Sequence, residues 1–144
     1  MIVFNHEECV TKPRADMFLP NSLKGLGIFL DIVAIALGIV AIITQLWGLF
    51  LGTAGCGILG IAAYLCWKNQ TICILDENRF EYTTFLGKKT IYYFTDITAL
   101  RVNSDSFTLF VGNGKVHIES MAMISQKLLD KINAALEKNS SEKK

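Results

Sequence analysis

Residues 25–67 read GLGIFLDIVAIALGIVAIITQLWGLFLGTAGCGILGIAAYLCW, and Asp31 is the one charged residue in this run. A membrane-spanning helix rises about 1.5 Å per residue and needs roughly 20 apolar residues. The run is therefore long enough for two spans, and the polar pair Thr44–Gln45 near its middle is the candidate turn between them. The sequence predicts a transmembrane helical hairpin at 23–67, with spans at about 23–43 and 46–67.

Tryptophan residues flank the second predicted span. Trp47 and Trp67 stand at its two ends, and tryptophan favours the membrane–water interfaces because its ring is apolar while its N–H seeks water. Asn21 or Ser22 is a candidate cap for the first helix, directly after Pro20.

The basic residues are distributed unevenly around the two spans. The segment between the spans has no Lys or Arg, whereas the other side carries Lys12, Arg14, Lys24 and Lys68. By the positive-inside rule we expect a multi-pass protein of the cell membrane with both termini in the cytoplasm and residues 1–22 as a cytoplasmic segment. A cleaved signal peptide fits poorly, because the apolar run starts late and exceeds the 7–15 residues of a signal core.

Small residues recur every four positions in the second span, at Gly48, Gly52, Cys56 and Gly60. The first span has a shorter set of small residues at the same spacing, Ala34 and Gly38, which could pack against this stripe. Small residues let helices approach closely in lipid, where packing drives association. The stripe either closes the hairpin itself or forms an interface between two copies of the chain, so a homo-oligomer is one of two alternatives.

Asp31 lies about two turns into the first span, where an ionisable group is costly. It is a candidate intramembrane polar site, for a proton or ion relay or for docking of another membrane protein. The alternative is a carboxylate that reaches the interface and is satisfied by Tyr64, Lys68 or water. Neither span contains a second titratable carboxylate, which makes a transport pathway the weaker interpretation.

After the second span the pattern changes to short, β-rich segments separated by turns of about two to five residues. Such short links favour antiparallel neighbours, and Asn113-Gly114 is a strong hairpin signal. We predict six strands, at 71–75, 80–86, 89–94, 97–102, 107–111 and 116–118.

An amphipathic helix follows the strands, with Ile124, Leu128 and Ile132 on its apolar face and Ser120 as candidate cap. The sequence thus predicts an α+β domain at 69–138, an antiparallel β-meander of six or seven strands closed by a C-terminal helix. Residues 139–144 read as a disordered tail.

The stretch FEYTTFLGKKTIYYFTDIT, residues 80–98, resembles bacterial PH-domain (PH-like) small membrane proteins. The shared features are two aromatic strands, a Gly-Lys turn and an Asp-Ile start to the next strand; Lys12-Pro13-Arg14 before the first span is also similar. The resemblance implies a PH-like fold with seven strands before the helix. Residues 2–4, Ile-Val-Phe, are the candidate seventh strand.

Headgroup-specific lipid binding is not expected. PH-like modules that bind inositol phosphates use a basic first hairpin loop, and here that loop, Asp76–Arg79, is net acidic. Lys88 and Lys89 at the next turn, together with Lys68, are candidates for general contact with anionic membrane lipids.

No catalytic, cofactor or metal site is predicted. The sequence has no Gly-rich phosphate loop, nucleophile elbow or paired-His motif, and the adjacent residues of His6-Glu7-Glu8-Cys9 point to opposite faces of an extended segment. The net charge of +1 argues against nucleic-acid binding. The four cysteines are expected to be reduced.

Three function classes remain. The first is a non-catalytic, membrane-anchored interaction module that binds a cytoplasmic or membrane protein by strand addition or peptide docking. The second is a lipid-facing envelope or stress sensor that contacts anionic headgroups. The third is a small transport or pore element built from oligomerised hairpins.

Overall fold

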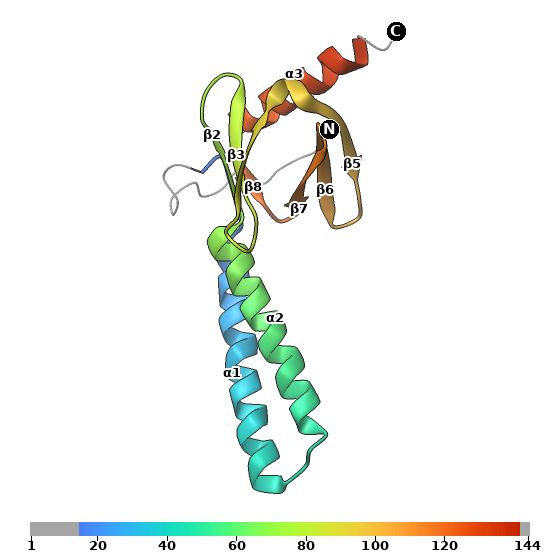
Figure 1. Ribbon diagram of the computed structural model, residues 1–144. Helices are drawn as coiled ribbons and strands as arrows, with labels where there is room; N and C mark the ends of the chain where they lie inside the picture. The colour runs from blue at the N-terminus through green and yellow to red at the C-terminus, as the bar shows by residue number, and fades with distance from the viewer. Residues whose placement is uncertain (1–14, 142–144) are drawn as a thin grey trace.

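The computed structural model describes residues 15–141. Two long helices, α1 (Asn21–Thr44) and α2 (Leu49–Asn69), form a hairpin that extends from a β-rich domain, and α3 (Gln126–Ser141) lies at the end of this domain remote from the hairpin (Figure 1). With mean hydropathies of 2.8 and 1.9, α1 and α2 are long and apolar enough to span a membrane. The α+β layout agrees with the prediction.

The hairpin presents apolar side chains outward along its length. Ile43 and Leu51, for example, are 75% and 81% exposed. Helix α1 ends at Thr44, the next residue Gln45 adopts a left-handed conformation (φ 55°), and α2 begins at Leu49. Trp47 therefore lies in the turn before α2 and stacks on Phe50, with ring centroids 5.6 Å apart.

The strands form two antiparallel sheets. The first has the order β4-β3-β2-β1-β8 and the second the order β5-β6-β7. The 3₁₀ turn η1 (Phe94–Asp96) leads from the first sheet to the second. The bounds are β1 (Met17–Phe18), β2 (Thr71–Ile74), β3 (Arg79–Thr83), β4 (Lys89–Tyr93), β5 (Ile97–Val102), β6 (Ser106–Val111), β7 (Gly114–Glu119) and β8 (Met123–Ile124).

Strand β1 enters the first sheet from before the hairpin. Met17 is paired with Ile72 of β2 on one side and with Ile124 of β8 on the other. The domain thus includes residues on both sides of the hairpin, whereas the sequence predicts its start at 69. The candidate strand at residues 2–4 lies outside the described residues.

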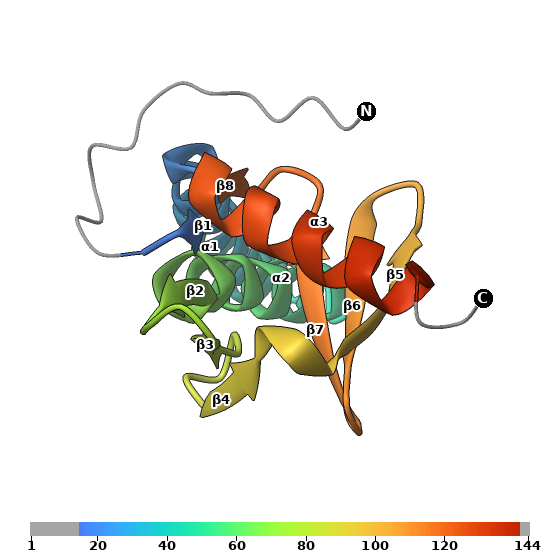
Figure 2. The same cartoon turned by 90° about the horizontal axis from the view of Figure 1, so that it is seen from above.

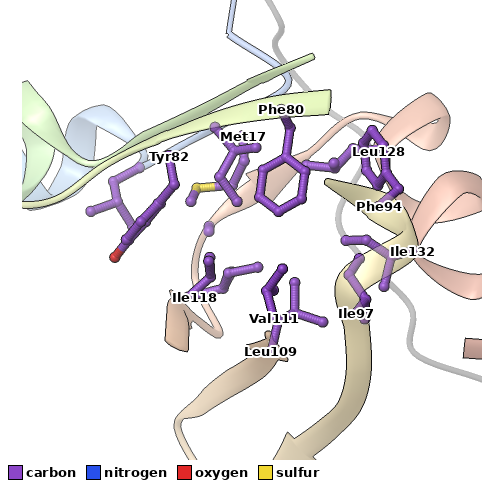
Figure 3. Packing of buried hydrophobic residues seen from close by; sticks show 14 residues of the cluster. Met17, Phe80, Tyr82, Phe94, Ile97, Leu109, Val111, Ile118, Leu128 and Ile132 are labelled. Atoms are coloured by element: carbon purple, nitrogen blue, oxygen red, sulfur yellow. The ribbon is translucent and has the colours of Figure 1, made fainter. Parts of the chain in front are cut away.

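The core fills the space between the two sheets and α3 (Figure 3). The Phe80 ring packs against the Phe94 ring in a tilted arrangement, with centroids 4.9 Å apart. Leu128 and Ile132 bring the apolar face of α3 onto this cluster. Seen along the hairpin, α3 crosses the domain from β8 towards β5 (Figure 2).

Helix α3 differs from the prediction at both ends. Its N-terminus is capped by Ser125, whose hydroxyl accepts a hydrogen bond from the Leu128 N–H at 3.2 Å, and Ser120 lies in the turn that precedes β8. At its C-terminus the helix continues through Ser141 in place of the tail predicted from 139. This last turn contacts the second sheet, where the Asn139 side-chain amide donates to the Ile97 carbonyl of β5.

Candidate functional site

Specific polar contacts lie at the domain end of the hairpin, both between its two helices and between the chain after α2 and the β domain. The Trp67 indole N–H of α2 donates to Asn21 Oδ1 of α1 at 3.1 Å, and Lys24 Nζ lies 4.8 Å from the centre of the Trp67 ring. Beyond the helix, the buried Gln70 donates to the His117 carbonyl of β7 at 3.0 Å. The Asn21 side chain therefore binds the Trp67 indole. It is not the cap of α1, because the N-cap residue of that helix is Pro20.

Asp16 connects three segments that are far apart in the sequence. Its Oδ2 accepts a hydrogen bond from the Ile74 N–H of β2 at 2.8 Å, and its Oδ1 accepts one from the Ser125 hydroxyl at 3.1 Å. Its backbone is bonded to Ile72 and Ser125 as well. One carboxylate therefore links the entry to the hairpin, the strand after it and the cap of α3.

The two long helices approach most closely near their domain end, at Gly27 and Gly60. A Cβ added to Gly27 would lie 2.9 Å from the Gly60 carbonyl oxygen, and one added to Gly60 would lie 2.9 Å from the Gly27 carbonyl oxygen. Further along, Gly57 faces Ala34 and Gly38 faces Thr53, with an added Cβ at 3.7 and 3.5 Å respectively.

The predicted stripe of small residues is distributed around this contact face. Gly60 lies at the closest approach, and a Cβ at Gly52 would reach only Leu37, at 3.9 Å. Cys56 is half-buried. Gly48 precedes α2 and has nothing within 4 Å of an added Cβ.

Asp31 lies within the hairpin contact. A Cβ on Gly60 would overlap the Asp31 carboxylate, so the absence of a side chain at position 60 makes room for this group. The residue is half-buried. Within residues 15–141 its carboxylate has no hydrogen bond or salt bridge, and that includes the predicted partners Tyr64 and Lys68.

The candidate lipid-contact lysines differ in their surroundings. Lys89 forms a 2.9 Å salt bridge with Glu81 of the neighbouring strand, and this carboxylate raises the pKa of the Lys89 ammonium. Lys88 is exposed, and its ammonium has no hydrogen bond or ion pair with the described part of the chain. Lys68 is exposed near the end of α2.

An open groove of about 440 Å³ lies between α3 and η1. At its rim Lys131 Nζ binds Glu77 Oε2 at 2.6 Å and lies 5.4 Å from the centre of the Phe94 ring; the ammonium lowers the pKa of the Glu77 carboxyl. Lys138, by contrast, makes no hydrogen bond or salt bridge within residues 15–141. The lining residues are Glu77, Phe94, Thr95, Lys131, Ala134, Ala135, Lys138 and Asn139.

The described residues contain no group of three or more His, Cys, Asp or Glu side chains that can hold a metal ion. His117 is exposed on β7 and lies 3.3 Å from the Glu119 carboxylate. Cys56, Cys66 and Cys73 are free thiols, and burial raises the pKa of the Cys73 thiol. The His6–Cys9 cluster lies outside the described residues.

No family model, curated protein or solved structure matches this chain.

Proposed function

We propose that the chain is a non-catalytic, membrane-anchored interaction module with a PH-like domain. In this proposal α1 and α2 cross the cell membrane, both termini lie in the cytoplasm, and the domain binds a protein partner through the groove between α3 and η1. The apolar exterior of the hairpin and the absence of Lys and Arg between its helices support the anchoring and the orientation.

The observation that carries the proposal is the position of the groove. It lies beside α3, at the end of the domain remote from the hairpin (Figure 1). Because β1 before the hairpin and β2 after it pair in one sheet, the domain has a fixed orientation on the helices. A groove on a domain held in this way faces away from the bilayer, where a partner has access to it.

The groove lining combines apolar surface with the positive charge of Lys138. Phe94, Ala134 and Ala135 supply the apolar surface, and Lys138 supplies an ammonium that has no hydrogen bond or salt bridge within residues 15–141. Small residues on α3 leave room for an inserted side chain. These features fit a peptide segment with an apolar anchor followed by a carboxylate, since a buried anchor in a pocket provides most of the affinity of such contacts.

Native mass spectrometry of the tagged full-length chain, gently extracted from its own membrane, tests the proposal. We expect a reproducible heteromeric mass that Ala134→Arg in the groove abolishes. Asn133→Arg is the matched control, because Asn133 is an exposed neighbour on α3 outside the groove lining. A bare monomer or a homo-oligomer, or equal loss with both variants, contradicts the proposal.

A further inference from the structure

The turn between β3 and β4, residues 84–88, lies beside the domain end of α2 (Figure 1). We call it the helix-side turn. The Asn69 side-chain amide at the end of α2 donates a hydrogen bond to the Phe85 carbonyl at 2.7 Å. The turn is therefore attached to the last residue of the helix, and its height relative to the hairpin is set by that contact.

The backbone of the helix-side turn is well defined. The Gly87 N–H donates to the Thr84 carbonyl at 2.8 Å, and the Thr84 N–H donates to the Lys88 carbonyl at 2.9 Å. Gly87 has φ +83°, a left-handed conformation that other residues rarely adopt. These bonds hold two successive large apolar residues, Phe85 and Leu86, at the tip of the turn.

Both tip side chains are exposed, Phe85 by 45% and Leu86 by 72%. Lys88 follows them directly, and its ammonium has no hydrogen bond or ion pair with any residue of the described range 15–141. Two exposed apolar side chains followed by an exposed cation match the layering of a bilayer surface, in which the acyl boundary lies below the anionic phosphates. Single exposed apolar residues are ordinary; this pair is distinguished by its position relative to the hairpin.

The pair lies at the height of the expected interface. Asn69 follows Trp67 by two residues, a rise of about 3 Å along the helix, and interfacial segments bury their apolar face about 5–10 Å into the headgroup boundary. The indole of Trp67, bound to Asn21, marks the polar end of the hairpin. A turn bonded to Asn69 is consequently within reach of the boundary that Trp67 favours.

We propose that the helix-side turn inserts Phe85 and Leu86 into the interfacial layer of the bilayer that the hairpin crosses, with the Lys88 ammonium on a lipid phosphate. This inference rests on the membrane anchoring in the proposed function and adds a second, non-helical contact with the bilayer. The turn fixes the tilt of the domain. Lys89 takes no part, because its charge is offset by Glu81.

Photo-crosslinking of the full chain to lipid tests this inference. A benzophenone amino acid is placed at Leu86, Leu75 or Leu51 in separate variants, each reconstituted in nanodiscs of equal parts phosphatidylcholine and phosphatidylglycerol. Leu75 is the matched control, since it is an exposed Leu at the opposite end of the first sheet, after β2. Leu51, an exposed residue of α2, is the positive control for lipid contact of the hairpin. Intact mass spectrometry after irradiation measures the lipid adducts.

We expect lipid adducts at Leu51 and Leu86 and none at Leu75. Adducts at Leu51 without adducts at Leu86 overturn the inference and leave the membrane anchoring intact. Absence of adducts at Leu51 overturns the anchoring itself. Equal adduct yields at Leu86 and Leu75 also contradict the inference, because they indicate lipid contact without regard to position in the domain.

Discussion

The Asp31 carboxylate of α1 occupies the space that a side chain at Gly60 of α2 would need. A Cβ at position 60 would also lie 2.9 Å from the Gly27 carbonyl oxygen, so both a side chain and the backbone of α1 limit the space there. This relationship makes position 60 the most constrained glycine of the hairpin.

We expect Gly60→Ala to destabilise the hairpin by about 1–3 kcal/mol, the usual cost of overpacking. Gly55→Ala is the control, since an added Cβ there has nothing within 4 Å, and Ala is the better helix former by about 0.5–1 kcal/mol. Equilibrium unfolding of the purified chain in mild detergent measures both. We expect the double variant D31A/G60A to recover only part of the stability lost in G60A. Removing the Asp31 carboxylate relieves one overlap, but the new Cβ still meets the Gly27 carbonyl oxygen. Equal stability of G60A and G55A would refute the close approach.

Asp16 supports a second prediction, on the junction of the domain. Replacing it by Ala removes acceptors for the Ile74 N–H and the Ser125 hydroxyl, and hydrogen bonds to charged groups contribute about 1.5–3 kcal/mol. We expect Asp16→Ala to lower the melting temperature of the full chain by several degrees. Asp130→Ala serves as control, because Asp130 is exposed on α3 and its one side-chain hydrogen bond among residues 15–141 comes from Gln126. A melting temperature equal to that of the control would show that Asp16 does not secure the junction.

The start of α3 provides a third prediction. Ser125→Ala removes the side-chain cap and is expected to cost about 0.5–2 kcal/mol, the range for Ser caps. Ser120→Ala, at the position that the sequence favours as the cap, is expected to leave stability unchanged within error. Chemical unfolding followed by circular dichroism distinguishes the two, and the reverse order would place the start of the helix at Ser120.

The Glu77–Lys131 pair at the groove rim predicts a pH dependence. Lys131 lowers the pKa of Glu77 below its ordinary value of 4.5, so the folded state favours the ionised carboxylate. Its contribution is complete at neutral pH and is lost as the pH falls through the lowered pKa of Glu77. We expect Glu77→Gln to lower the melting temperature at pH 7 and to match the wild type in acid below that pKa. If the melting temperatures of the wild type and Glu77→Gln differed by the same amount at neutral and acidic pH, the Glu77–Lys131 salt bridge would not stabilise the folded state.

The hairpin and the longer strands were predictable because each has a continuous local pattern. Residues 97–102, for example, were expected as a strand and form β5. Strands β1 and β8 have two residues each, too few for an alternation of apolar and polar positions. Their pairing also joins segments that are separated by the hairpin, so no local signal points to it.

The residues of α2 that contact α1 could be predicted from the sequence only in part. Selecting small residues every four positions yields Gly48, Gly52, Cys56 and Gly60, but a helix has 3.6 residues per turn. The positions of α2 that face α1 at Gly27, Ala34 and Gly38 are Thr53, Gly57, Gly60 and Tyr64, with spacings of four, three and four. A fixed period of four drifts off this face within a few turns.

The polar residues of the junction were missed for a related reason. Asp16 bonds partners 58 and 109 positions away, and Asn21 bonds Trp67 across 46. As single residues they are indistinguishable from ordinary turn and cap residues. The groove likewise requires α3 and η1 to be placed side by side.

Strand β1 also determines the order in which the protein can assemble. Met17 lies between Ile72 and Ile124 in the first sheet, and its β2 partner is made only after both helices of the hairpin have been synthesised. During translation the segment with Met17 has neither of its partner strands until both helices have left the ribosome. The first sheet can therefore be completed only after the whole hairpin has been synthesised. A chain arrested within α2 lacks β2 and cannot form the domain.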